Sequence, residues 1–140
     1  MQLKNILTKY NFSQRINVAK TTLEEIENQI LVSLPEDYKF YLENFDGFFG
    51  SIGLEFVNLW GCDEILERNN SYGIINKLPM TLGIGDNASS EFIAIEFYNL
   101  KVNRIILSPL IDLDKQYHLT IGDSFTDFLT RLDNNESWFS

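Results

Sequence analysis

The sequence SLPEDYKFYL occupies residues 33–42, and NFDG follows at residues 44–47. Pro35 suits the first turn of a helix, because its missing N–H would have no partner there. Glu36 and Asp37 add negative charge at the positive end of the helix dipole, and Gly47 is a natural stop. The segment therefore predicts a helix from Pro35 towards Gly47, with an apolar stripe of Tyr38, Tyr41, Leu42 and Phe45.

A second helix is predicted just before this segment. Thr21 with Glu24 three residues later forms a capping-box pattern, and Leu23, Ile26 and Ile30 recur on one face. Residues 1–20 are interpreted as an arm or a short helix.

Beyond Gly47 the pattern changes to strands. Apolar residues alternate over residues 53–58, with Leu54 and Phe56 on one side. Further strands are predicted over residues 80–84, 91–97, 104–107 and 118–121, the first two joined as a hairpin by the turn 85–90. One or two helical turns are expected over residues 63–68, a loop over 69–78, and a closing helix after Asp123 or Ser124.

This order predicts an α+β fold with a mainly antiparallel sheet, helices at the N-terminal side and a closing C-terminal helix. The 140 residues fit one domain, with a core over residues 21–132 and a tail over 133–140. The first 20 residues lack a signal-peptide pattern, and no apolar run approaches the ~20 residues of a membrane span. With one cysteine in the chain, no disulfide can form within it, so a cytoplasmic protein is expected.

The charge is strongly acidic, with 11 Lys and Arg against 20 Asp and Glu and a net charge of −9. Residues 1–20 hold four of the basic groups and none of the acidic ones, so the rest carries 7 basic and 20 acidic groups. Such a surface repels nucleic acid and attracts basic proteins. Solubility alone explains the same charge equally well.

Catalytic patterns are weak throughout. His118 and Cys62 are the only histidine and cysteine, and no third orienting group completes a triad with them. Asp112 and Asp114 have the spacing of a calcium loop but lack its glycine and closing glutamate. Gly83 and Gly85 lack the rest of a phosphate-binding motif. No enzyme activity, metal or cofactor is expected.

Surface recognition of a protein is the remaining expectation. Carboxylates around aromatic anchors would suit a basic partner. The candidate partner-binding residues are Trp60, Asp63, Glu64, Glu67, Tyr72, Asp86, Glu91, Asp112 and Asp114.

Three blocks of the sequence, in order, resemble the SMI1/KNR4 family of the SUKH superfamily. They are SLPEDYKFYL with its NFDG stop, IGDN at residues 84–87, and IGDSFTDFL at residues 121–129. Family members often carry glycine after the Gly-Asp-Asn turn, where this chain has Ala88-Ser89-Ser90, so the chain departs from the family pattern at that hairpin.

The resemblance implies an α+β fold and, for many bacterial members, an immunity protein that binds a polymorphic toxin such as a nuclease. Other members act as regulatory or scaffold proteins, and this alternative stays open. The implied partner is a cognate toxin protein of basic character, with no direct contact to nucleic acid or membrane. The sequence leaves the oligomeric state open.

Overall fold

One antiparallel sheet, with strand order β1-β2-β3-β4-β5-β6, organises the described part of the chain. The computed structural model describes residues 2–16, 22–99 and 103–138. The strands are β1 (Phe48–Ile52), β2 (Glu55–Leu59), β3 (Thr81–Asp86), β4 (Glu91–Phe97), β5 (Asn103–Pro109) and β6 (Leu119–Gly122). The helices are α1 (Gln2–Lys9), α2 (Leu23–Ile30), α3 (Glu36–Asn44), α4 (Ile65–Tyr72), α5 (Ile74–Lys77) and α6 (Phe125–Asp133), with a 3₁₀ turn η1 (Lys115–Tyr117) before β6. The predicted α+β class is confirmed.

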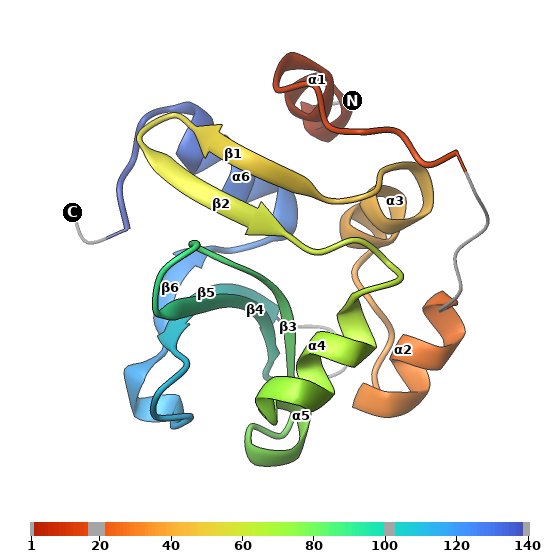
Figure 1. Ribbon diagram of the computed structural model, residues 1–140, viewed down its shortest axis with the longest axis vertical. Coiled ribbons are helices and arrows are strands. Elements are labelled where there is room, and N and C mark those ends of the chain that lie inside the picture. The colour runs from red at the N-terminus through yellow and green to blue at the C-terminus, as the bar shows by residue number, and fades with distance from the viewer. Residues whose placement is uncertain (1, 17–21, 100–102, 139–140) are drawn as a thin grey trace.

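The sheet bends sharply between β2 and β3. These strands share two register pairs, Asn58 with Asp86 and Leu59 with Gly85, whereas β4 pairs with β5 over seven. Figure 1 shows the result, with the β1–β2 hairpin standing apart from the curled sheet of β3 to β6. The hairpin turn packs on the end of α6: a Cβ added to Gly53, at φ +58°, would lie 2.1 Å from the carbonyl oxygen of Leu132. A residue with a side chain does not fit there.

Helices α3 and α6 pack together through aromatic rings. The ring centroid of Phe125 lies 5.1 Å from those of both Tyr38 and Tyr41. Asp37 adds a polar link, since its Oδ2 accepts hydrogen bonds from the backbone N–H and the hydroxyl of Thr126, at 2.9 and 2.8 Å. The SLPEDYKFYL helix is thereby joined to the closing helix, far away in sequence.

Several predicted boundaries need correction. The cap of α2 is Thr22, whose hydroxyl accepts a hydrogen bond from Glu25 N–H at 3.2 Å; Thr21, the predicted cap, lies outside the described residues. Strand β1 was not predicted. The predicted loop over 69–78 is wrong, because α4 continues to Tyr72 and α5 follows.

No helix among the described residues is both long enough and apolar enough to cross a membrane.

Candidate partner-binding face

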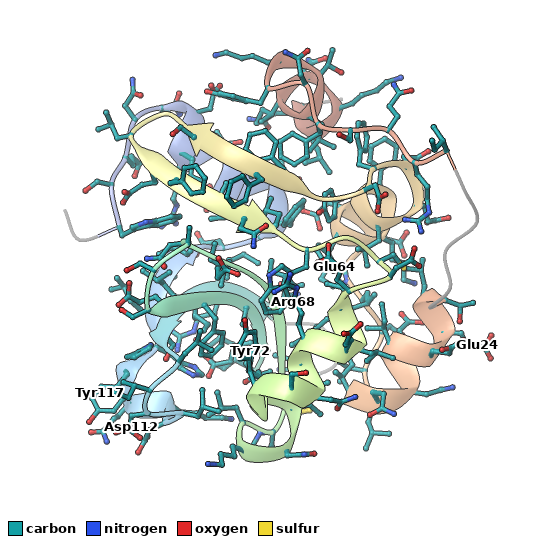
Figure 2. All side chains as sticks on the ribbon, in the orientation of Figure 1. Glu24, Glu64, Arg68, Tyr72, Asp112 and Tyr117 are labelled. Carbon is teal, nitrogen blue, oxygen red and sulfur yellow. The ribbon has the colours of Figure 1, made fainter. Side chains whose placement is uncertain are left out.

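Six of the nine predicted site residues gather around α4 and the junction of β2 with β3. Glu64 immediately precedes α4, and Figure 2 shows its side chain in a row with those of Arg68 and Tyr72, beside this helix on the side towards the curled sheet. Asp112 lies at another corner of the molecule, on the segment before β6 (Figure 2). The six residues around α4 are Trp60, Asp63, Glu64, Glu67, Tyr72 and Asp86; we call their surface, together with Arg68, the α4 face.

Trp60 supports this face from beneath. Its side chain is fully buried, and its indole N–H donates a hydrogen bond to Asp86 Oδ2 at 3.1 Å. The Tyr72 ring stacks over it, with centroids 6.0 Å apart, and remains 40% exposed. Tyr72, and not Trp60, is therefore the aromatic side chain that a partner can reach.

The α4 face has more carboxylates than cations. Arg68 donates to Glu64 at 3.0 Å, and its guanidinium also lies 5.5 Å above the Trp60 ring. Arg15 reaches two carboxylates, Asp46 at 3.7 Å and Asp63 at 3.5 Å, with a side chain only 11% exposed. Within the α4 face, the guanidinium of Arg68 thus stands beside the carboxylates of Asp63, Glu64, Glu67 and Asp86. Arg15 and Asp46 at its border add one charge of each sign, so the balance is negative.

A buried asparagine fixes α4 on the sheet. The Asn69 amide accepts a hydrogen bond from Gly83 N–H at 2.7 Å and donates to Gly83 O at 2.8 Å and Ile65 O at 2.7 Å. The Asn69 side chain thus makes the hydrogen bonds to the Gly83 backbone that a neighbouring strand would otherwise make. Because this helix is clamped, the charges on its outer side are held in fixed positions.

Glu91 and Asp114 are engaged in their own turns. Glu91 accepts hydrogen bonds from Asn87 Nδ2 at 2.7 Å and from Ser90 Oγ at 2.8 Å. Asp114 caps η1 by accepting a hydrogen bond from Gln116 N–H at 3.0 Å. Hydrogen bonds from the backbone and the side chain of Gln116 lower the pKa of the Asp114 carboxyl. With Asp112 they lie outside the α4 face.

Phe49 and Phe56 form an exposed pair that sequence reasoning missed. Phe49 pairs with Asn58 and Ser51 with Phe56, so these four side chains share the outer face of the β1–β2 hairpin. The two rings meet edge to face, with centroids 4.8 Å apart. The inward side of β2 is formed by Val57 and Leu59, whereas Leu54 and Phe56, the apolar residues of the predicted alternation, are exposed. The signal available in the sequence was the apolar pair Val57 and Leu59, two residues apart.

The two residues examined for catalysis are both buried. The His118 side chain is 0% exposed, and its Nδ1 lies 2.8 Å from Glu96 Oε2. Arg104 donates to the other oxygen of Glu96 at 2.6 Å. Cys62 is 2% exposed, and burial raises the pKa of its thiol, which favours the protonated, unreactive form. Within the described ranges, no group of three or more His, Cys, Asp or Glu side chains is arranged to hold a metal ion.

Comparison with known protein families identifies the family of this chain. No curated protein matches the chain. The sequence model of the SMI1/KNR4 family (SUKH-1) matches residues 17–131, which include α2, α3, all six strands and most of α6. The match covers each of the three sequence blocks on which the resemblance rested, and it shows that the chain belongs to the SMI1/KNR4 family.

Proposed function

We propose that this protein is an immunity protein, which binds a cognate toxin protein in the cytoplasm and neutralises it by covering its working surface. Membership of the SMI1/KNR4 family, for which the sequence resemblance implied this role in many bacterial members, is the observation that carries the proposal. In this mechanism the protein acts by binding alone, without a reaction of its own.

The charge of the α4 face supports a basic partner. Toxins that cleave nucleic acid need Lys and Arg to neutralise phosphates. An excess of carboxylates on a fixed helix would pair with those groups and exclude the nucleic acid by both shape and charge. Tyr72 offers an aromatic contact among these carboxylates.

The test is growth rescue by co-expression. Any toxin-like gene found next to this one is expressed alone, with the wild-type protein, and with the variant E67K, which reverses an exposed charge on α4. The matched control is E24K, which makes the same change on α2, away from the α4 face (Figure 2).

Wild type and E24K should restore growth and copurify with the toxin, whereas E67K should protect less well. If folded wild-type protein neither restores growth nor forms a complex, the immunity proposal is refuted, and the scaffold alternative takes its place.

A further inference from the structure

The outer face of the β1–β2 hairpin exposes large apolar side chains on a regular strand surface. Phe49 is 72% exposed and Phe56 is 36% exposed, while Leu54 at the hairpin turn is 68% exposed. The opposite face of the same strands buries Ile52 and Val57 completely. The phenylalanines are therefore not needed to fill the core of this hairpin.

The exposed pair is held in place before any partner arrives. The two rings meet edge to face, with their centroids 4.8 Å apart and their planes at 83°. They belong to paired strands, so each ring limits the motion of the other. Rigid aromatic side chains lose little conformational entropy on binding, which is why they dominate binding energy at protein interfaces.

Acidic side chains border this pair. A shallow depression runs from the hairpin to α4, and its lining includes Phe49, Asn58, Asp46 and Glu64. Asp46 is 53% exposed and Glu64 is 47% exposed at the side chain. The apolar hairpin face and the acidic α4 face therefore adjoin, as an interface with an apolar centre and a charged rim would require.

This surface could be covered by a second copy of the chain or by a basic partner protein, and the charges distinguish the two. A second copy would bring another net charge of −9 and set the same carboxylates against each other. A basic partner would instead gain ion pairs at the rim while covering the two rings.

We propose that the outer face of the β1–β2 hairpin, centred on Phe49 and Phe56, is the apolar anchor that receives the basic partner protein, with Asp46 and Glu64 as its charged rim. This assignment rests on the proposed function, since the partner is the cognate toxin. It names the surface that provides most of the affinity.

The experiment uses calorimetry to measure the dissociation constant of the purified complex with the toxin domain that the wild-type protein neutralises in the co-expression test. The variants are F49S and the double variant F49S/F56S. The control is I111S, which removes an apolar side chain that is 93% exposed on the segment before β6. Thermal unfolding of each variant checks that it folds. If the double variant does not fold, the F49S variant alone tests the proposal.

F49S should weaken binding at least about tenfold, and the double variant should weaken it further, because exposed aromatic anchors account for most interface energy. I111S should bind within about twofold of wild type. Hydrogen exchange in the wild-type complex should show protection over residues 48–59.

Two results would overturn the assignment in different ways. If wild type binds but F49S binds equally well, and residues 48–59 gain no protection, the anchor lies elsewhere and the immunity proposal stands. If wild type forms no complex at all, the proposed function fails and the docking assignment fails with it.

Discussion

At the scale of single residues, buried polar side chains join separate elements of the fold. Asn69 is completely buried, and all three of its hydrogen bonds go to backbone groups. Glu96 is 4% exposed and serves Arg104 and His118 at once. Asn69 supplies partners for the backbone groups of Gly83, and Glu96 supplies one for the buried His118 ring, so removal of either side chain would leave polar groups without a partner.

The substitution N69A should lower the free energy of unfolding by about 2–4 kcal/mol, because it leaves both backbone groups of Gly83 without their partner. Its exposed neighbour provides the control, since N70A should change stability by less than about 0.5 kcal/mol. Urea unfolding of the three proteins measures both. Equal stabilities for N69A and N70A would show that the clamp on α4 adds nothing.

Glu96 should make the free energy of unfolding depend on pH in the acidic range. Burial raises the pKa of this carboxyl, but the hydrogen bonds from Arg104 and His118 and the positive charge of Arg104 outweigh that effect, so the pKa lies below its ordinary value of 4.5. The folded protein therefore holds the ionised form more strongly than the unfolded chain. This stabilisation is present above pH 4.5 and is lost as the pH falls through the lowered pKa of the folded state.

The variant E96Q isolates this contribution. At pH 7 it should be less stable than wild type by about 1–3 kcal/mol, and the difference should shrink as the pH is lowered below 4.5. Unfolding by urea at several pH values measures the difference. A gap that stays constant from pH 7 to pH 3 would contradict the role assigned to the ionised carboxylate.

At the scale of elements, helix α3, which carries the SLPEDYKFYL sequence, is joined to the closing helix α6 by hydrogen bonds. Asp37 of α3 accepts from the backbone N–H of Thr126, in the first turn of α6, where free N–H groups need partners. Ser124 caps the same helix from its own chain segment, accepting from Asp127 N–H at 2.9 Å. Helix α6 thus has a local cap and a distant one.

Removing the distant cap with D37A should cost about 1–2 kcal/mol of unfolding free energy. The neighbouring acid gives a matched control: Glu36 has a side chain that is 93% exposed, so E36A should have little effect. Thermal or urea unfolding distinguishes the two. If both variants lose the same stability, Asp37 acts only through its place in the first turn of α3.

The elements predicted from sequence are those with strong local signals. The α3 helix, the β3–β4 hairpin and α6 have clear periodicity and turn residues, and the structure confirms them. The end of α4 was missed because Asn69, Asn70 and Ser71 are poor helix formers; its helical form depends on the Asn69 bonds to a distant strand. Strand β1 was missed because Gly50 and Ser51 interrupt its apolar pattern.

At the scale of the whole molecule, the acidic charge is distributed so that one side carries a candidate interface. Of the nine residues predicted to bind a partner, six lie around α4, and all but one of these six come from a single stretch of the chain. The sequence could not predict that Trp60 is buried or that Phe49 and Phe56 are exposed. Which side of a strand faces the core depends on the register with its neighbours and on the layers that cover the sheet.

Association with the toxin should be sensitive to salt. If exposed carboxylates attract a basic partner, the association rate should fall several-fold between low and high ionic strength, because screening shortens the reach of the charges. Stopped-flow mixing at several salt concentrations measures this. E67K should show a lower rate at low salt and a weaker salt dependence, while an unchanged rate for wild type would exclude charge steering.

The exposed edge of the sheet has a consequence for aggregation. Among the described strands, β1 pairs with β2 on one side only, and an unpaired strand edge is a template on which other chains can add. An edge that also carries Phe49 would be especially prone to this, were it not bordered by carboxylates such as Asp46. These charges act as gatekeepers that keep copies of the protein apart. In the proposed mode of binding, the carboxylates that attract a basic partner therefore also disfavour the addition of further copies of the chain at this edge.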